Sequence, residues 1–340
     1  MNKKIAFPHL GNYHIPLKYL INNLTDCEVI NVPYITKKTI ELGIKYSPEF
    51  VCIPFKYNLG NFIEALDKGA NVIIKFNNGC SSKYYNEVQK QILNDLGYEF
   101  DFYSLTDKSI YKILKKLNNK LNLFKYLYYY IITLLMIYYM DKIDIYIRGN
   151  IGFEVRENSF EILFHKMLKD FSNTKNIFKL IMLYFKYKKL FKNIEVNKPT
   201  KLIKIGIIGE LYVCMESYSN YDLEKLLGSL NVEITRYTNV TYLLIKKRFN
   251  HKKILKKILK YCKYNIGDEA INNIYKAIGY AEKGYDGLIY IKPYLCTSLI
   301  GSMHILNKVI EDINIPIFYI TFDDKTSIED LKTSLEEFYI

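Results

Sequence analysis

The feature that most constrains the fold of this chain is an alternation of short apolar runs with helical patterns. Four such runs lie in the first hundred residues, at 4–7, 27–32, 50–54 and 71–76. Four more lie toward the other end, at 201–208, 232–237, 287–293 and 315–322. Strands that alternate with helices form βαβ units, in which the strands are parallel. The sequence therefore predicts an α/β protein with two Rossmann-like lobes and largely parallel sheets.

The middle of the chain has a different pattern. Between about residue 109 and residue 197, strand-like runs give way to long stretches of Leu, Ile, Tyr and Lys, and "VNKPTK" at 196–201 has the composition of a linker. We expect a helical insert. The predicted domains are an N-terminal α/β lobe at 1–108, a helical segment at 109–198 and a C-terminal α/β lobe at 199–340.

Two local signals predict helix boundaries within the lobes. Gly69 follows a helical stretch at the position where a helix commonly ends in a left-handed residue. Ser327, with Asp330 three residues later, has the pattern of a helix start.

The net charge of +13 does not by itself predict a nucleic-acid partner. Only four of the 48 basic residues are arginine, at 148, 156, 236 and 248. Surfaces that read bases or clamp phosphates favour arginine, because its planar guanidinium forms two hydrogen bonds at once. The lysines are therefore interpreted as a solvated surface coat, and no nucleic-acid binding is expected.

The sequence also predicts a cytoplasmic protein. The N-terminus carries no apolar stretch of signal-peptide length. The longest uncharged run, Tyr126 to Met140, is 15 residues long, against roughly 20 for a membrane-spanning helix. We expect a buried helix there and no membrane association. In a reducing cytosol the six cysteines are not expected to form structural disulfides.

Three of these cysteines follow predicted strands and precede predicted helices: Cys52, Cys80 and Cys296. In open parallel sheets such loops lie at the carboxyl edge of the strands, where ligands bind. Helix N-termini at that edge favour a thiolate, which is the form that binds metals. The alternative is that each cysteine packs as a small buried apolar residue. The shared position favours a common soft-metal site.

The other three cysteines are weaker candidates for this site. Cys27 lies at the opposite end of its predicted strand, and Cys262 lies in the lysine-rich stretch His251–Lys263, for which a core-facing amphipathic helix is predicted. Both are expected to be inert. Cys214 also follows a predicted strand, and its role stays open.

Three thiolates without a histidine in these loops suit an iron–sulfur cluster better than a complete structural zinc site. A cubane cluster normally has four protein ligands, so a cluster held by three leaves one iron open to water or substrate. Zinc stays a weaker alternative.

Several longer segments resemble the 2-hydroxyacyl-CoA dehydratase superfamily, and within it the branch of acyl-CoA dehydratase activase-related proteins. They are "FPHLGNYHIPLKYL", "SPEFVCIPFKYNLGNFIEALDKGANVII", "GIIGELYV" and "YAEKGYDGLIYIKPYLC…PIFYITFDDKT". The resemblance extends over nearly the whole chain and is most specific around Cys52 and Cys80.

The resemblance implies a [4Fe–4S] cluster between two Rossmann-like lobes, with Cys52, Cys80 and Cys296 as its ligands. In that family an ATP-hydrolysing activator supplies a low-potential electron, which passes from the cluster to an acyl-CoA. The implied activity is that of a dehydratase-like lyase or of a component of an ATP-dependent reductase. The implied assembly is a dimer, of identical or different subunits. A distant branch carries a larger double-cubane cluster, which stays open as an alternative.

Other candidate site residues lie in loops at the same predicted edge. His9 and His14 flank Gly11 after the first predicted strand, where they are candidates to relay protons or to donate hydrogen bonds to cluster sulfides, and ordinary loop histidines are the alternative. Glu210 follows the first strand of the second lobe and is an acid–base candidate, with helix capping as the alternative. Lys56 and Lys292 each lie four residues from a cysteine. They would balance the charge of a thiolate cluster or bind a substrate phosphate, and surface charge is the alternative.

Two function classes follow. The first is an iron–sulfur protein that receives electrons from an ATP-dependent activator and transfers them to a substrate or partner. The second is a clusterless two-lobed scaffold that associates with such an ATPase. The chain is not expected to be the ATPase itself, because it has no phosphate-binding loop of the G-x-x-x-x-G-K-[ST] type.

Overall fold

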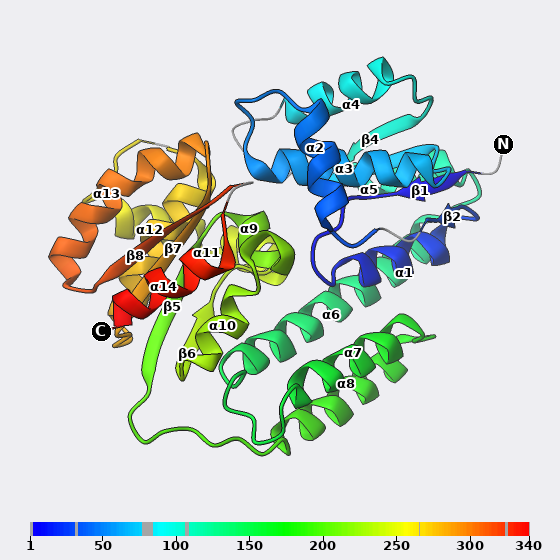
Figure 1. The fold of residues 1–340 in the computed structure, drawn as a ribbon. Helices are drawn as coiled ribbons and strands as arrows, with labels where there is room; N and C mark the ends of the chain where they lie inside the picture. Colours follow the sequence, from blue (N-terminus) through cyan, green and yellow to red (C-terminus); the bar gives the residue numbers. More distant parts are fainter. Residues whose placement is uncertain are drawn as a thin grey trace. The chain divides into compact units, whose positions relative to one another are not determined.

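The computed structural model describes residues 3–30, 33–76, 84–105, 109–264, 266–323 and 326–339. The chain forms two compact units, Met1–Ile137 and Tyr138–Ile340 (Figure 1). Each unit contains one four-stranded parallel sheet, so the predicted α/β class with two Rossmann-like lobes is confirmed.

The sheet of the N-terminal unit has the strand order β2-β1-β3-β4, and every neighbouring pair is parallel. Its strands are β1 (Lys4–Ala6), β2 (Glu28–Val29), β3 (Val72–Phe76) and β4 (Asp101–Leu105). The order reverses between β1 and β3. Adjacent central strands therefore carry the chain to opposite sides of the sheet, as in doubly wound folds.

Helices cover both faces of this sheet. They are α1 (His14–Leu24), α2 (Lys37–Tyr46), α3 (Ile53–Asp67), α4 (Tyr85–Asp95), α5 (Ile110–Leu117) and the start of α6 (Leu123–Arg148). Side chains of α1, α5 and α6 pack with Ile5, Val72 and Ile74 in one apolar cluster. Side chains of α3 and α4 pack with Ala6 and Ile73 in another. Neighbouring residues of one strand thus enter opposite cores, as expected for a sheet that is buried on both faces.

Helices α2 and α3 cross at two glycines. An ideal Cβ on Gly43 would lie 2.0 Å from the carbonyl oxygen of Lys56, and one on Gly60 would lie 1.8 Å from that of Thr39. The Thr39 hydroxyl also donates a 2.7 Å hydrogen bond to Glu64 of α3. The two backbones are therefore in direct contact, and neither helix tolerates a side chain at the crossing.

Replacing Gly60 by alanine should destabilise the protein by about 1–3 kcal/mol, the usual cost of overpacking a close contact. The matched control is Gly279→Ala within α12 (Asp268–Ala281), where a Cβ meets no atom within 4 Å. That substitution should stabilise by up to about 1 kcal/mol, because alanine is the better helix former. Urea unfolding followed by far-UV circular dichroism measures both. Equal effects of the two substitutions would contradict the tight crossing.

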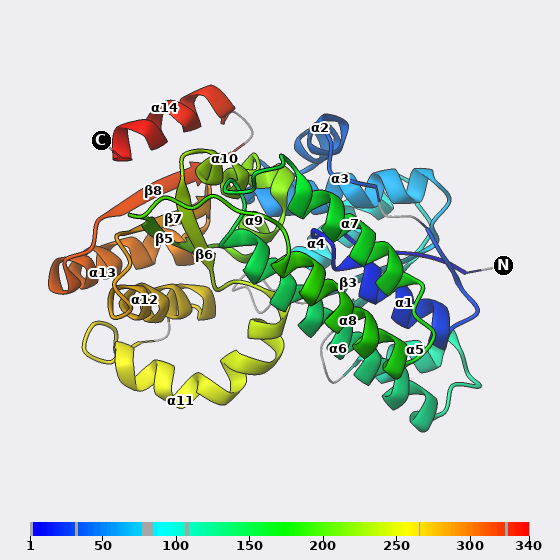
Figure 2. The ribbon, with the colours of Figure 1, turned by 90° about the horizontal axis from the view of Figure 1, so that it is seen from below.

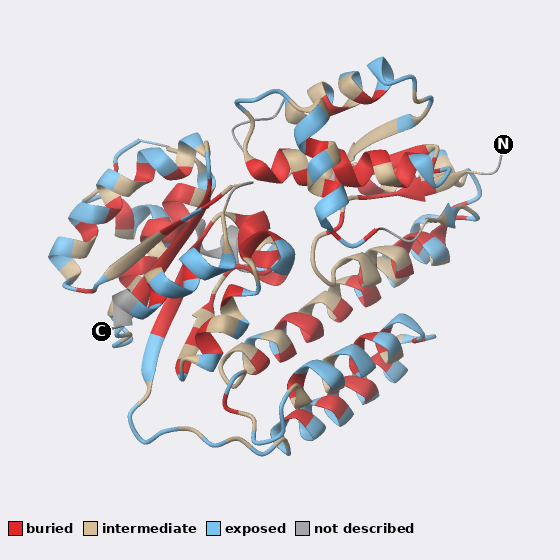
Figure 3. Ribbon diagram, viewed as in Figure 1, coloured by how far each residue is buried: buried red, intermediate tan, exposed pale blue. Residues whose placement is uncertain are grey.

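The sheet of the C-terminal unit has the order β6-β5-β7-β8, again entirely parallel. Its strands are β5 (Ile203–Gly209), β6 (Val232–Arg236), β7 (Gly287–Pro293) and β8 (Ile317–Phe322). Every residue of β7 is buried, as is most of β5 (Figure 3). This sheet repeats the order of the first, with the reversal between β5 and β7.

The helices of this unit again lie on two sides. They are α9 (Leu211–Met215), the 3₁₀ turn η1 (Ser217–Asn220), α10 (Leu223–Ser229), the π-helical turn η2 (Tyr242–Lys246), α11 (Lys247–Ile258), α12 (Asp268–Ala281), α13 (Thr297–Ile313) and α14 (Ile328–Tyr339). Side chains of α11, α12 and α13 share one apolar cluster with β5 and β7. Helices α10 and α14 lie on the opposite side of the sheet (Figure 2).

The segment between the two sheets is helical, as predicted. After α5 and α6 come α7 (Ser159–Ser172) and α8 (Ile177–Lys192). Phe160 of α7 stacks on Phe191 of α8, with ring centroids 6.4 Å apart. Tyr139 of α6 stacks on Tyr184 of α8 at 3.9 Å. The boundary between the two units lies within α6, so this helix contributes residues to both.

Helix α6 has 26 residues and, within the described parts of the chain, is the one helix long and apolar enough to cross a membrane by length and composition. In its most apolar window, 28% of the residues are buried in this structure. It is thus not the fully buried helix that the sequence predicts. Phe124 and Ile131 are exposed, whereas Ile132 and Met136 are buried. A core helix passes the same test, so length and composition do not assign α6 to a membrane.

One predicted strand is wrong. Residues 50–54 do not form a strand: the segment before Cys52 connects α2 to α3, and the Phe50 side chain is 83% exposed. The apolar residues from Ile53 onward belong to a helix, which begins with proline within its first turn, where proline is well tolerated. Short apolar runs fit a buried helix start as well as a strand.

Both predicted helix boundaries are confirmed. Gly69 has φ +87° just after α3, and its N–H bonds to the Leu66 carbonyl oxygen at 2.8 Å. Ser327 precedes α14, and its hydroxyl oxygen accepts a 3.1 Å hydrogen bond from the backbone N–H of Asp330.

Candidate functional site at the carboxyl edges of the sheets

Each sheet has one topological reversal, and the loops that follow its two central strands are where ligands bind in doubly wound folds. In the N-terminal unit these loops follow β1 and β3. In the C-terminal unit they follow β5 and β7. Helices α3 and α12 run back across the sheet and lead into β3 and β7, so each of these helices also begins at this edge.

Cys52 lies at this edge for a reason other than the predicted one. It is the N-cap of α3, which leads into β3, with φ −68° and ψ 155°. Its carbonyl oxygen accepts the Phe55 N–H at 2.9 Å, while its side chain makes no capping hydrogen bond. The thiol is partly exposed at the N-terminus of a 15-residue helix. That is a position at which the helix dipole favours a thiolate.

Cys80 falls outside the described residues, in the segment 77–83 that follows β3. Its sequence position, four residues after the end of β3 at Phe76, is all that is established for it.

Cys296 is the N-cap of α13 and follows β7, as predicted. Its Sγ lies 3.7 Å from the hydroxyl oxygen of Ser298. Burial, and to a smaller extent the carboxyl groups of Glu210 and Glu269, raise the pKa of this thiol to about 12. The Ser298 hydroxyl and the Leu299 N–H act in the opposite direction. Cys296 is therefore a protonated thiol at neutral pH, and a metal ion would have to displace its proton.

Glu210 follows β5 and caps α9, accepting a 2.8 Å hydrogen bond from the backbone N–H of Val213. The capping interpretation of this residue is therefore confirmed. Burial raises the pKa of its carboxyl group to about 7, although the N–H groups of Val213 and Tyr212 lower it. A carboxyl group with a pKa near 7 exchanges its proton readily at neutral pH, which is the property an acid–base group needs.

The variant Glu210→Gln should alter the pH dependence of stability. Because the folded protein holds this proton more tightly than the unfolded chain, wild-type stability falls as pH rises from about 4.5 to about 7. The variant keeps a capping oxygen and loses this dependence. Its stability relative to wild type should therefore rise across that window by up to about 3 kcal/mol and stay level above it. Urea unfolding of the iron-free protein at several pH values measures this, and parallel curves would contradict it.

The structure brings His9 and His14 together. Their rings stack with centroids 5.5 Å apart, and Tyr34 lies 5.1 Å from the ring of His9. The His14 Nδ1 lies 2.9 Å from the carbonyl oxygen of Gly11. The buried His9 donates its backbone N–H to Asn61 at 2.8 Å. The first loop is thus held in place by α3, which carries Asn61.

The second lobe holds its first loop in the same way. Asn273 of α12 accepts the Gly209 N–H at 3.0 Å and donates to the Gly209 carbonyl oxygen at 3.2 Å. In both units a buried asparagine on the helix before the third strand fixes the end of the first strand. Neither asparagine was predicted from the sequence as part of the site. Their signal was an asparagine within an otherwise apolar helical stretch.

The two predicted lysines differ. Lys56 lies on α3 and is partly exposed. Lys292 is the penultimate residue of β7 and is only 8% exposed, so it is not part of a surface coat. Burial lowers the pKa of its amino group, and the nearby thiol of Cys296 raises it. Lys75, in the same position on β3, is also 8% exposed and was not predicted.

The remaining cysteines lie away from these loops or inside the protein. Cys214 is buried on α9, and burial raises the pKa of its thiol to about 12. The Cys262 thiol donates to the Tyr264 carbonyl oxygen at 3.0 Å. Cys27 packs against the core of the N-terminal unit. Within the described ranges, no three His, Cys, Asp or Glu side chains are grouped as metal ligands.

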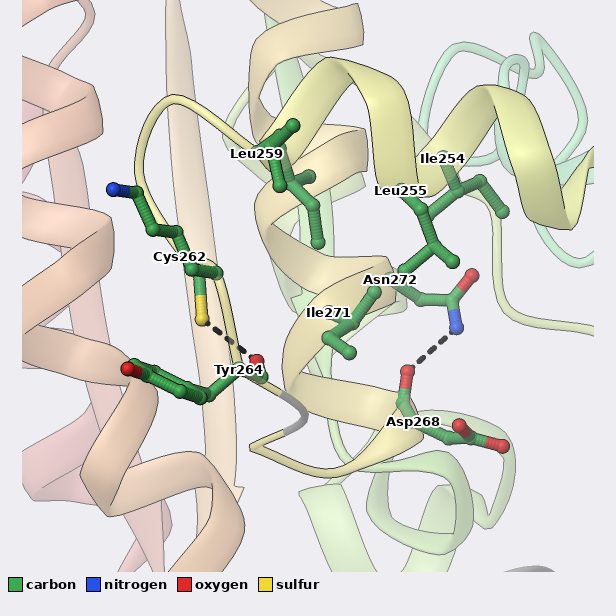
Figure 4. Close-up of a pocket in the computed structure, with 10 residues that line it drawn as sticks. Ile254, Leu255, Leu259, Cys262, Tyr264, Asp268, Ile271 and Asn272 are labelled. Atoms are coloured by element: carbon green, nitrogen blue, oxygen red, sulfur yellow. Dashed lines mark hydrogen bonds between the residues drawn. The ribbon is translucent and has the colours of Figure 1, made fainter.

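A cavity of about 310 Å³ lies between α11 and α12 (Figure 4). Of the residues that line it, Ile254 and Ile271 are buried, while Leu259 is largely exposed. Ile254 and Ile258 are buried, whereas Leu255 is not. The sequence predicts that Ile254, Leu255, Ile258 and Leu259 share the core-facing side of this helix. That prediction is confirmed for Ile254 and Ile258 and is wrong for Leu255 and Leu259, which are exposed.

Comparison with models of known protein families gives no match for this chain, and comparison with curated proteins gives none either.

Proposed function

We propose that this chain is an iron–sulfur protein similar to the 2-hydroxyacyl-CoA dehydratase superfamily, with Cys52, Cys80 and Cys296 as cluster ligands. The observation that supports the proposal is the matched placement of Cys52 and Cys296. Each is the N-cap of a long helix at the carboxyl edge of its own parallel sheet, although the two sheets are far apart in sequence.

The donor groups fit a thiolate-bound metal. The Cys52 side chain makes no capping hydrogen bond, so binding a metal there would not uncap α3. The Leu299 N–H and the Ser298 hydroxyl at the start of α13 favour the charged form of Cys296, against the effect of burial. Because the thiol pKa is raised, metal affinity should increase with pH.

A [4Fe–4S] cluster, or the larger double-cubane cluster, would supply one-electron transfer at low potential. The side chains of this chain would orient the substrate and move protons. Glu210 exchanges a proton near neutral pH, and His14 lies beside His9 in the loop after β1.

We further propose that the electrons come from an ATP-dependent activator and pass to an acyl-CoA or to a partner protein. The chain would then be a dehydratase-like lyase or a component of an ATP-dependent reductase. It would work as a dimer in the reducing cytoplasm, where such clusters persist.

Iron and sulfide analysis of anaerobically purified protein tests the proposal. We expect about four irons and about four sulfides per chain, with absorbance near 400 nm that bleaches on reduction. A colourless protein without iron would leave the clusterless scaffold that associates with an activating ATPase. Zinc at about one atom per chain would identify a structural or hydrolytic zinc protein instead.

A further inference from the structure

The two sheets end their third strands in the same way. Lys75 is the penultimate residue of β3 and pairs with Ser104 of β4, while Lys292 is the penultimate residue of β7 and pairs with Thr321 of β8. Both lysines are 8% exposed. A buried ammonium group is costly unless a partner compensates for its lost hydration. The N-terminal unit supplies a hydrogen-bond partner for its lysine, and the described part of the C-terminal unit does not.

In the N-terminal unit the partner is a glutamine. The amino group of Lys75 donates to the Gln89 side-chain oxygen, and the Gln89 amide donates to the Phe55 carbonyl oxygen at 3.0 Å. Gln89 is the middle residue of the buried stripe on α4, between Asn86 and Leu93. This lysine is therefore satisfied within the protein.

In the C-terminal unit the corresponding position holds a short side chain. The buried stripe of α13 has the same spacing, with Ser302 between Leu299 and Leu306. The Ser302 hydroxyl bonds to the Leu299 carbonyl oxygen and to the Tyr290 hydroxyl, both at 2.8 Å. Within the described parts of the chain, no side chain forms an ion pair or hydrogen bond with Lys292.

Strand geometry places Lys292 on the face of the sheet that α13 covers. Side chains alternate along β7, so Lys292 shares a face with Tyr290. The Tyr290 hydroxyl lies 3.1 Å from the Leu299 carbonyl oxygen, in the first turn of α13. Lys292 is two residues closer to the carboxyl edge, and its amino group interacts electrostatically with Cys296, the N-cap of the same helix.

We propose that Lys292 and the first turn of α13 bind an oxyanion, namely the phosphate or carboxylate group of a small ligand. The first N–H groups of a helix have no partner within the helix, and together with the helix dipole they form an anion site. Helix α13 has 17 residues, and the Ser298 hydroxyl adds a donor in its first turn. A lysine supplies the point charge that phosphate sites commonly use. In the N-terminal unit, the Gln89 side chain takes the place beside Lys75 that the oxyanion would take beside Lys292.

This inference depends on Lys292 and α13 and does not require a metal at Cys296. Glu210 and Glu269, which both act electrostatically on Cys296, are the acidic groups to consider. The carboxyl group of Glu210 is partly neutral near pH 7, so its repulsion of a bound anion is weakened.

Calorimetric titration of the iron-free protein with inorganic phosphate tests the inference, with acetate as the carboxylate probe. Wild type should bind at least one of the two, and Lys292→Gln should bind it at least about tenfold more weakly. The matched control is Lys308→Gln, an exposed lysine on α13, which should bind as wild type does. Tighter binding of phosphate or of acetate identifies which group the site takes.

Absence of binding by wild type, or equal binding by Lys292→Gln, would overturn the proposal. A second measurement on the unmutated protein covers the case in which the variant does not fold. Reductive methylation followed by mass spectrometry should show that the anion protects Lys292 but not Lys308. Equal labelling of Lys292 with and without the anion would also overturn it.

Discussion

Replacing Cys52 by alanine should reduce the iron content of the anaerobically purified protein from about four atoms per chain to less than about one. Cys52 is partly exposed at the N-terminus of α3, and its side chain makes no capping hydrogen bond. Its loss should therefore leave the helix intact while it removes a ligand. The same substitution at Cys296 should have the same effect.

Cys27→Ala is the matched control, because Cys27 is also partly buried in the N-terminal unit but lies at the other end of the sheet. It should retain the iron of wild type. Iron, sulfide and absorbance near 400 nm are measured on all three variants, with far-UV circular dichroism to verify folding. A folded Cys52→Ala or Cys296→Ala variant with undiminished iron would remove that cysteine from the ligand set.

Arg236→Gln should destabilise the C-terminal unit by about 3–5 kcal/mol, the cost of removing one partner from a buried ion cluster. Arg236 lies at the end of β6 with its side chain 3% exposed, and its Nε is 2.9 Å from Glu224. Arg148 of α6 contacts the same Glu224 and forms two hydrogen bonds, at 2.7 and 2.9 Å, with Asp144. Arg236 also donates to the Cys214 carbonyl oxygen. Without Arg236, two carboxylates share one cation.

The chain offers a matched control in Arg156, which is exposed before α7. Arg156→Gln should change the free energy of unfolding by less than about 0.5 kcal/mol. The chain has no tryptophan, so urea unfolding is followed by far-UV circular dichroism. If Arg236→Gln stays within about 1 kcal/mol of wild type, the cluster contributes little to stability.

The arginines illustrate what composition predicts. A chain with four arginines among 48 basic residues was expected not to use them on a nucleic-acid surface. Arg148 and Arg236 instead hold two carboxylates together inside the C-terminal unit. That use depends on the planar fork of the guanidinium group, which lysine lacks.

Most strands and helices were predictable because their signal is local. The predicted bounds of β7 and α13 coincide with the observed ones, since an apolar run and a 3.6-residue period are properties of consecutive residues. The two errors in the predicted strands also come from local sequence signals. The run at 50–54 starts a helix rather than a strand. The strand β4 (Asp101–Leu105) was missed because its residues are mostly half-exposed and carry a weak apolar signal.

What the sequence alone determined was the alternation of strands and helices, and with it the parallel sheets that place Glu210 and Cys296 at carboxyl edges. Cys52 reaches its edge as the N-cap of α3 and not after the strand that the sequence predicts. The period of the apolar residues specifies this alternation, because it depends on consecutive residues and not on contacts between distant parts of the chain. Only the tertiary structure decided the partners of the buried polar groups. Lys75 donates a hydrogen bond to Gln89, whereas within the described residues Lys292 forms no side-chain hydrogen bond or ion pair. The difference depends on atomic positions set by the packing of a strand against a helix, and the period of either element does not specify those positions.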